Sequence, residues 1–364
     1  MRNIFGNALT LTIFGESHGE CVGGVIDGLP AGLEIDMDYI MWEMTKRKST
    51  VDISTTRNED DVPLFLSGIK DGFTEGTSVA FIIPNKNARP SDYNELQGIA
   101  RPGHADYAAQ AKYEGYQDAS GGGHFSGRLT SVMVTAGAIL KKALQNKGIL
   151  VSSHIKNLNG IEDADFDWNK VIEEMLDLND REFAVLDEEK GNLMIERIKA
   201  AREEQDSVGG ILETVVYGVP AGTGEPLFTS IESEIAQAMF SIGAIKGIQF
   251  GKGFDFATMK GSEANDPFYV EDEMIFTRTN NNGGINGGIS NGMPIVFQTV
   301  VKPTPSIGKV QQTVNFETME NVEIKINGRH DPAIIHRART VVDCMTAFVM
   351  ADLLVQRYGN RWLV

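Results

Sequence analysis

Cysteine is scarce in this chain, and the sequence contains no long uninterrupted run of apolar residues. Cys21 and Cys344 stand far apart among 364 residues, without the CxxC spacing or neighbouring histidines of a zinc site. This usage suits a reducing compartment and does not exclude a disulfide. The most apolar late stretch, Val341 to Val355, carries Asp343 and Asp352, which argues against a membrane span. The first residues also lack the basic region, apolar core and cleavage site of a signal peptide, so we expect a cytoplasmic protein.

Positive charge is also in short supply. The chain has 33 Lys and Arg against 50 Asp and Glu, a formal net charge of −17, so nucleic acid and anionic membranes are poor partners. Much of the acidic excess lies between Glu162 and Asp206, a pattern typical of solvated helical faces. The sequence contains no GxxxxGK[ST], no GxGxxG after a strand and no HExxH. It therefore disfavours a P-loop enzyme, a dinucleotide-binding Rossmann domain and a zinc hydrolase.

Glycine, by contrast, is plentiful, at 39 of 364 residues. It is densest in the run from 278 to 307, RTNNNGGINGGISNGMPIVFQTVVKPTPSI. Each glycine costs a helix or strand about 1 kcal/mol relative to alanine, so this density needs a reason. The apolar residues Ile285, Ile289 and Met293 between the glycines argue against a flexible linker. We expect a shaped loop whose N–H groups hold a phosphate or a planar cofactor.

Hydrophobic periodicity predicts strands and helices that alternate without regular βαβ spacing. The expected strands lie at 9–14, 21–27, 79–83 and 294–301, the first two as an antiparallel pair. The expected helices lie at 36–48, 130–147, 168–178, 193–204, 229–242 and 336–358, and Thr229 with Glu232 forms a capping box for the fifth. Because no composition break is long enough for a linker, we expect one α+β domain over residues 1–364.

Five of the six histidines lie beside glycine or arginine in separate loops. They are His18 in GESHG, His104 in RPGHADY, His124 in GGGHFSGR, His330 in GRHDP and His336 in IIHRA. A lone histidine is more often structural, and a lone arginine more often forms a surface ion pair. Here the histidines recur with Arg101, Arg128, Arg329 and Arg337. Together they predict a pocket for a multiply anionic small molecule, with imidazoles that transfer protons near neutral pH.

Several blocks of sequence follow one another along nearly the whole chain. They are FGESHG at 14–19, IDGLPAG at 26–32, RPGHADY at 101–107, GGGHFSGR at 121–128, SIGAIKGIQFGKGF at 241–254, NNNGGINGGISNG at 280–292, KPTPSI at 302–307 and GRHDP at 328–332. In these blocks the chain resembles the chorismate synthase family. The resemblance implies a single-domain β-α-β sandwich of the α+β class, with long central helices between antiparallel sheets. It also implies a homotetramer.

The same resemblance implies a reaction. 5-Enolpyruvylshikimate 3-phosphate loses phosphate and a ring proton in an anti 1,4-elimination that gives chorismate, the last step of the shikimate pathway towards aromatic amino acids. The implied cofactor is reduced FMN, without net redox change, because a reduced flavin lends electron density as the C–O bond breaks. The resemblance also associates NADP with the activity. Members that reduce their own flavin tend to be longer, so we expect an external flavin reductase as a partner.

Residue roles carry over from the resemblance at matching positions. His18 is implied to donate a proton to the departing phosphate, His104 to protonate or stabilise reduced flavin, and Asp331 to act with the flavin as the base that removes the ring hydrogen. Ser17 and Ser126 are implied to support this proton relay. Flavin contacts are implied at His124, Phe125, Ser126, Gly243, Ala244, Gly287, Lys302, Pro303, Thr304, Pro305, Ser306 and Arg329. Substrate contacts are implied at Lys46, Arg57, Arg101, Arg128 and Arg337, and no metal is implied.

Two loops depart from the pattern common in the family. GGGHFSGRLT stands where many members read GGGRSSARET, so the loop loses a cation unless His124 is protonated. KRKST at 46–50 stands where many read RRRPG, which puts Lys46 where an arginine would clamp the substrate. These departures leave open a flavin- or phosphometabolite-binding protein without catalysis. The motifs alone also leave open a metal-assisted phosphohydrolase built on the His–Asp pairs at 104–106 and 330–331.

Overall fold

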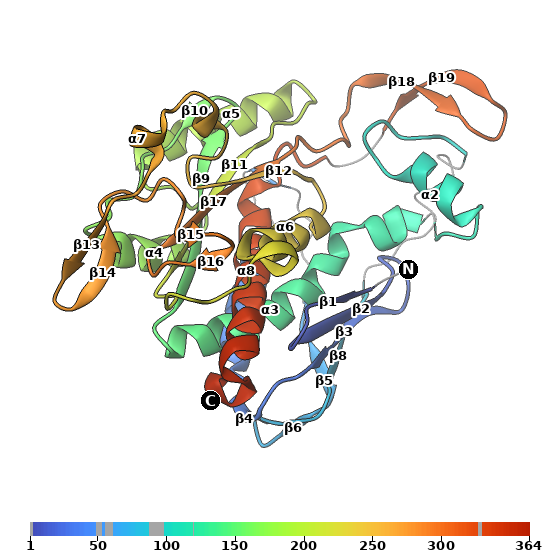
Figure 1. Ribbon diagram of the computed structural model, residues 1–364. Coiled ribbons are helices and arrows are strands. Elements are labelled where there is room, and N and C mark those ends of the chain that lie inside the picture. The colour runs from blue at the N-terminus through green and yellow to red at the C-terminus, as the bar shows by residue number, and fades with distance from the viewer. Residues whose placement is uncertain (1–2, 49–52, 55–60, 87–97, 119, 327–329) are drawn as a thin grey trace.

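The architecture is a sandwich in which two antiparallel sheets enclose long helices (Figure 1). A computed structural model describes residues 3–48, 53–54, 61–86, 98–118, 120–326 and 330–364. The first sheet has the order β1-β2-β3-β8-β5, with strands β1 (Ile4–Phe5), β2 (Thr10–Gly15), β3 (Cys21–Asp27), β8 (Val79–Pro84) and β5 (Leu64–Ser67). The second has the order β10-β9-β11-β17-β12, with strands β10 (Ile161–Glu162), β9 (Leu150–Leu158), β11 (Gly210–Tyr217), β17 (Ile295–Val301) and β12 (Ile245–Phe250).

The helices α3 (Thr130–Asn146) and α8 (Ile335–Tyr358) lie between these sheets and cross each other (Figure 1). α3 packs on β3 and β8 of the first sheet, whereas α8 packs on β9 and β11 of the second. The crossing is close because Gly137 has no side chain: a Cβ placed there would lie 2.3 Å from the carbonyl oxygen of Cys344. Both helices bury residues on nearly every side, as expected of helices between two layers.

Smaller elements surround this centre. The other helices are α1 (Met37–Thr45), α2 (Asp106–Tyr113), α4 (Val171–Asp180), α5 (Glu188–Glu203), α6 (Ile231–Ser241) and α7 (Gly261–Ala264). A small sheet contains β4 (Ala31–Glu34), β7 (Phe73–Glu75) and β6 (Ile69–Lys70), and hairpins are formed by β13 (Phe268–Glu271) with β14 (Met274–Thr277), β15 (Ile285–Asn286) with β16 (Ile289–Ser290), and β18 (Val310–Asn315) with β19 (Glu320–Lys325). The β18–β19 hairpin projects from the body beside α2, and the β13–β14 hairpin projects from the opposite edge (Figure 1).

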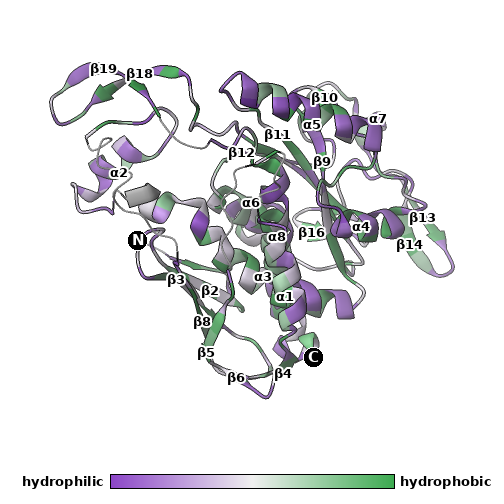
Figure 2. Ribbon diagram, turned by 180° about the vertical axis from the view of Figure 1, so that it is seen from behind, coloured by the Kyte–Doolittle hydropathy of each residue, from purple (hydrophilic) through white to green (hydrophobic). Residues whose placement is uncertain are grey.

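Hydropathy follows the layers. The strands of the two sheets are largely hydrophobic, while α5 and α7 at the periphery are mostly hydrophilic (Figure 2). One cluster of buried apolar side chains runs from Leu11 in the first sheet through Phe348 in α8 to Phe297 in the second sheet. A smaller cluster that includes Met175 and Val215 holds α4 against the second sheet. Burial of apolar surface, at about 25 cal/mol per Å², is therefore what joins the layers.

Most of the expected elements are present. The strands expected at 9–14 and 21–27 are β2 and β3, and they pair antiparallel as predicted. The helices expected at 130–147 and 336–358 are α3 and α8. Helices combined with antiparallel sheets confirm the predicted α+β class.

The capping box predicted for α6 is wrong. Ser230, not Thr229, is the N-cap, and its Oγ accepts a hydrogen bond from the backbone N–H of Ser233 at 3.1 Å. A short 3-10 turn over Leu227–Thr229 moves the helix start by one residue. Glu232 therefore lies in the first turn, where its charge favours the helix dipole.

The asparagine- and glycine-rich tract folds into a shaped loop, as expected. Gly283 has a φ of 64°, and a Cβ there would lie 2.6 Å from the backbone nitrogen of Gly251. The backbone N–H groups of Asn281 and Asn282 donate to the carboxylate of Asp266 at 2.7 and 2.9 Å. Although desolvation alone raises the pKa of Asp266, hydrogen bonds from the loop lower it below its ordinary value. These N–H groups thus hold an anion of the chain itself rather than an external phosphate.

His154 is buried in the second sheet between two carboxylates. Its Nδ1 lies 2.7 Å from Asp163 Oδ2, and its Nε2 lies 3.3 Å from Glu213 Oε1. Desolvation alone would lower the pKa of His154, but hydrogen bonds to both carboxylates raise it above its ordinary value. This histidine, which has no glycine or arginine beside it in the sequence, has a structural role, and its two carboxylate partners favour its protonated form.

We expect the stabilisation that His154 provides to fade as the pH rises. Because its folded-state pKa is raised, the contribution is complete below about pH 6.5 and is lost as the pH passes the folded-state pKa. The free energy of unfolding of the wild-type protein should exceed that of His154→Gln by most near about pH 6, and by less towards about pH 9. Urea denaturation across this range measures the difference. A difference that stays constant would mean that folding leaves the pKa of the imidazole unchanged.

Candidate active site

Two glycine-rich loops meet beside the end of β2. The first holds Ser17 and His18, and the backbone N–H of Ser17 donates to the carbonyl oxygen of Gly123 in the second at 3.4 Å. Ser17 Oγ lies 3.0 Å from His18 Nδ1. His124 Nε2 in the second loop lies 3.3 Å from Glu16 Oε1. The half-buried His18 is thus oriented by a serine, as a general acid or base needs to be.

The second loop also positions the start of α3. Ser126 Oγ accepts a hydrogen bond from the backbone N–H of Arg128 at 3.2 Å, which caps the short turn before that helix. Phe125 next to it is 52 % exposed. An exposed aromatic ring in this loop suits contact with a planar ligand.

Arg47 and Arg128 share the carboxylate of Asp61. Arg47 follows α1 and Arg128 precedes α3, and each guanidinium contacts a different oxygen of Asp61. Arg128 also donates to Asn85 Oδ1 at 2.8 Å, and Arg47 donates to Thr130 Oγ1 at 3.1 Å. Asp61 is 8 % exposed. Asp61 therefore brings two guanidinium groups together beside the start of α3.

Arg337, in the first turn of α8, adds a third guanidinium and pairs with Asp331. We call Arg47, Arg128 and Arg337 the guanidinium cluster. Burial, together with the nearby charges of Arg128 and Arg337, lowers the pKa of Arg47 despite its bond to Asp61. Positive charge is therefore concentrated at this point, where it can hold a phosphate or carboxylate by short contacts even in an acidic protein.

The loop that holds His104 packs on the KPTPS segment (302–306). Lys302 Nζ donates to the carbonyl oxygen of Gly103 at 2.7 Å. A Cβ on Gly103 would lie 2.7 Å from Pro305 Cβ, so only glycine allows this approach. Desolvation and the charge of Arg101 lower the pKa of His104 below its ordinary value. Its imidazole is therefore neutral near about pH 7 and offers one donor and one acceptor.

Arg101 is engaged within its own loop. Its Nε and one terminal nitrogen donate to the two oxygens of Asp106 at 2.8 and 2.7 Å. Burial alone would raise the pKa of Asp106, but the bonds from Arg101 lower it below its ordinary value. Across the described parts of the chain, no group of three His, Cys, Asp or Glu side chains could hold a metal ion. The two carboxylates on which a metal-assisted phosphohydrolase would depend, Asp106 and Asp331, are held by arginines instead.

The KPTPS segment also meets the residues after α6. The backbone N–H of Lys302 donates to the carbonyl oxygen of Ala244 at 2.9 Å, and Ala244 has a φ of 73°. A Cβ on Gly243 would meet no other atom within 4 Å. Among the described residues, Thr304 Oγ1 is buried without a hydrogen-bond partner. An unsatisfied buried hydroxyl costs about 1–3 kcal/mol, so these residues fit a bound polar group such as a flavin.

His330 and Asp331 link the two halves of the site. His330 Nδ1 lies 2.9 Å from Ser306 Oγ, and its Nε2 lies 2.9 Å from the carbonyl oxygen of Ile326. Asp331, the next residue, pairs with Arg337. Consecutive residues therefore tie the KPTPS segment to the guanidinium cluster.

Gly287 lies near the start of α6, in the β15–β16 hairpin. It is exposed, beside Gly288, whose carbonyl oxygen accepts from the N–H of Ile231 at the start of α6. Ala244 follows the opposite end of that helix. A helix of 11 residues is about 16 Å long, at about 1.5 Å per residue. The predicted residues Arg57 and Arg329 lie outside the described residues.

Lys46 is directed away from the guanidinium cluster. Its Nζ lies 3.1 Å from Glu43 Oε1 and 3.2 Å from the centre of the Trp42 ring. Within KRKST, Arg47 is the residue that lies with Arg128. Neither Arg47 nor Asp61 was predicted from the sequence as a site residue. One signal could have found Arg47. Glu43, three residues before Lys46, indicates that Lys46 forms an ion pair along its own helix. Arg47, one residue further on, points about 100° away from that pair and is free to reach another part of the protein.

Fold and site together fit an enzyme class whose α+β sandwich gathers arginines and histidines for a polyanionic small molecule. A family model described as chorismate synthase matches residues 9–355. The chain belongs to the chorismate synthase family, and it is a carbon–oxygen lyase of aromatic amino-acid biosynthesis.

Full-length relatives and a solved structure agree with this assignment. Chorismate synthase of Pyrococcus abyssi is 46 % identical over 352 residues, which cover 97 % of each chain. Chorismate synthase of Dehalococcoides mccartyi is 45 % identical over 357 residues, 98 % of this chain and 97 % of that protein. A crystal structure of chorismate synthase matches with a TM-score of 0.77 at 28 % identity, and covers 97 % of this chain and 94 % of that chain. The predicted chorismate synthase-like fold is confirmed.

Proposed function

We propose that this enzyme converts 5-enolpyruvylshikimate 3-phosphate into chorismate, phosphate and a proton by anti 1,4-elimination, with reduced FMN and no net redox change. The observation that carries the proposal is the guanidinium cluster beside Ser17 and His18. The substrate has one phosphate and two carboxylates, and each of these groups accepts paired hydrogen bonds from arginine. Asp61 and Asp331 hold the arginine forks in place before the substrate arrives.

The protons move through residues that the structure orients. Ser17 Oγ, 3.0 Å from His18 Nδ1, fixes the His18 ring, so that Nε2 can donate a proton to the departing phosphate. The cluster's positive charge stabilises the phosphate as its negative charge grows. Asp331, held by Arg337, accepts the ring proton. These roles rest on the family resemblance and on this geometry.

The cofactor residues supply binding and orientation. When bound, reduced FMN lends electron density to the breaking C–O bond and recovers it as the ring hydrogen leaves. Lys302 offers a positive charge to the flavin phosphate, and Thr304 offers its unsatisfied hydroxyl. The neutral imidazole of His104 offers an N–H to the flavin ring. Its position beside the KPTPS segment supports this assignment.

Chorismate formation under anaerobic conditions tests the proposal. The enzyme is mixed with 5-enolpyruvylshikimate 3-phosphate and photoreduced FMN, and chorismate is followed by its absorbance. A parallel sample contains oxidised FMN and EDTA. We expect turnover only in the first sample, because the elimination needs electron density that oxidised flavin does not supply.

Other outcomes point to the other functions. Phosphate release without flavin that EDTA abolishes would indicate the phosphohydrolase. Flavin binding without turnover, by a folded protein, would indicate that the departures at 46–50 and 124–129 have removed catalysis and left a binding protein.

We also propose that residues 1–364 form one domain, that the protein is a cytoplasmic homotetramer, and that an external NADP-dependent reductase supplies the reduced flavin. The continuous apolar core supports a single domain. Exposed apolar side chains support association, because contiguous apolar surface commonly marks an interface. They include Leu227, Phe228, Phe254, Phe268, Val270, Met274 and Ile275. No helix in the described part of the chain has the length and apolar character needed to cross a membrane. Light scattering in solution measures the oligomer.

A further inference from the structure

A cavity of about 230 Å³ lies between the end of α1, the segment after α4 and the first turn of α8. Trp42, Lys46, Lys48, Asp180, Glu182 and His336 are among its lining residues. Arg47 is not among them, and its guanidinium group contacts Asp61 instead. The volume corresponds to about eight water molecules, at about 30 Å³ each. One small organic molecule therefore fits, at a place distinct from the guanidinium cluster.

His336 lines this cavity with both of its ring nitrogens unsatisfied. The residue is 4 % exposed, and neither Nδ1 nor Nε2 has a hydrogen-bond partner among the described residues. Burial, followed by the charges of Arg337 and Arg339, lowers the pKa of His336 to about 3. The ring is therefore neutral at physiological pH and presents one donor and one acceptor. Buried polar groups nearly always have partners, so this side chain indicates a ligand in the cavity.

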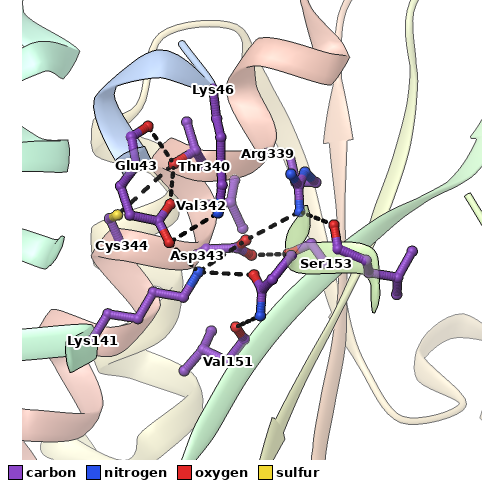
Figure 3. A network of polar contacts seen from close by, with 12 residues as sticks. Glu43, Lys46, Lys141, Val151, Ser153, Arg339, Thr340, Val342, Asp343 and Cys344 are labelled. Atoms are coloured by element: carbon purple, nitrogen blue, oxygen red, sulfur yellow. Dashed lines mark hydrogen bonds and ion pairs between the residues drawn. The ribbon is translucent and has the colours of Figure 1, made fainter. Parts of the chain in front are cut away.

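The buried end of the cavity is short of negative charge. Lys46 and Lys141 both donate to Oε1 of Glu43, at 3.1 and 2.9 Å. Lys141 also lies 3.6 Å from Asp343 Oδ2, which Arg339 approaches at 3.8 Å, so two carboxylates serve three cations. Figure 3 shows both lysines directed at Glu43, with Arg339 nearby. Desolvation and the charge of Lys141 lower the pKa of Lys46 to about 7, although Glu43 acts in the opposite direction. An anion placed between Lys46 and His336 would relieve this shortage.

The exposed end carries the opposite charge. Asp180 and Glu182 line the cavity and are themselves exposed. Arg181 and Lys48 also line the cavity. Asp177 at 2.6 Å and Glu188 at 3.7 Å offset the charge of Arg181. A dianion would be repelled at this end, whereas an ammonium group would be attracted. Cations at the buried end and carboxylates at the open end together complement a zwitterion.

We propose that this cavity binds a free α-amino acid, with its carboxylate between Lys46 and His336 and its ammonium group at Asp180 and Glu182. The His336 ring donates one hydrogen bond to the carboxylate. The Lys46 ammonium group supplies the opposing charge. The inference does not depend on the proposed elimination, because the site requires neither flavin nor the phosphorylated substrate.

Isothermal titration calorimetry on the full chain, without flavin or substrate, tests the proposal. The probes are glycine, leucine and phenylalanine, which increase in size. Propionate and propylamine each carry only one of the two charges. We expect saturable binding of at least one amino acid and none of the single-charge compounds at the same concentrations. Near about pH 8 the heat should vary with the buffer, because a carboxylate beside Lys46 raises its pKa and the complex takes up protons.

Two variants separate the ends of the site. His336→Leu removes the ring hydrogen bond at similar bulk, and Asp180→Asn combined with Glu182→Gln removes the charge at the open end. Each should weaken amino-acid binding about tenfold or more, the effect of losing one charge-assisted contact. Glu173→Gln, an exposed change on the same helix α4 but outside the cavity, is the matched control and should leave binding unchanged.

Three results would overturn the proposal. The first is absence of binding by every amino acid, which would mean that the cavity holds only water. The second is binding that neither variant weakens. The third is binding that shikimate 3-phosphate displaces and that Arg47→Ala abolishes, which would place the amino acid in the guanidinium cluster.

Discussion

Replacing His18 with alanine is expected to lower the kcat of chorismate formation by about 10²–10⁴-fold, the usual contribution of a general acid or base. The ring lies at the end of β2, oriented by Ser17 Oγ at 3.0 Å and beside the loop that carries Arg128. Without it the departing phosphate has no placed proton donor, while the guanidinium cluster still binds the substrate. KM should therefore change much less than kcat. Steady-state kinetics with photoreduced FMN measures both values.

His124→Ala is the matched control for this prediction. His124 lies in the adjoining loop, pairs with Glu16 at 3.3 Å and has a side chain that is 38 % exposed. As a proposed flavin contact it should raise the Kd for FMN and leave kcat nearly unchanged at saturating FMN. Circular dichroism and thermal unfolding check that both variants are folded. Equal losses of kcat in the two variants would contradict a specific proton transfer by His18.

The fold followed closely from the sequence because its strongest elements are long and periodic. α3 and α8 are buried along most of their length, and β2 with β3 form a local antiparallel pair. The start of α6 was misplaced because Thr229 and Ser230 are both good caps. Only the tertiary position of the preceding turn selects Ser230. Such one-residue choices depend on contacts that local patterns do not contain.

The candidate site was predictable as a set of residue types, but the pairing of its charges was not. Arginines near histidines indicated an anion site, and three arginines do come together with Asp61 and Asp331. The sequence does not show that Arg101 is taken up by Asp106 in its own loop. Side-chain direction at a helix end decides these pairings, and one residue along a helix changes it by about 100°.

The anion that the glycine-rich loop binds was also hard to predict from the sequence, because it depends on a contact between distant residues. Glycines and asparagines in the tract at 280–292 indicated exposed N–H groups, and the loop does present them. Asp266, 15 residues before Asn281, fills the place of the expected external anion. A composition pattern shows that backbone N–H groups are free of regular structure, but not which carboxylate reaches them first.

Gly137→Ala is expected to destabilise the protein by about 2–3 kcal/mol, although alanine is the better helix former by about 1 kcal/mol. An ideal Cβ at this position lies 2.3 Å from the carbonyl oxygen of Cys344 and 2.5 Å from its carbonyl carbon. These are backbone atoms of α8, so no side-chain rotation relieves the contact, and α3 and α8 must move apart. The midpoint of urea denaturation should fall accordingly.

Gly261→Ala is the control, because a Cβ at this position in α7 meets no other atom within 4 Å; its stability should stay within about 0.5 kcal/mol of the wild type. If Gly137→Ala were equally neutral, the central helices could separate at little cost.

The crossing of α3 and α8 should also affect substrate binding. α3 begins just after Arg128 and α8 carries Arg337 in its first turn, so the distance between the helices sets the spacing of the guanidinium cluster. Under conditions where Gly137→Ala is still fully folded, its KM for the phosphorylated substrate should therefore rise, an effect that loss of stability alone would not produce.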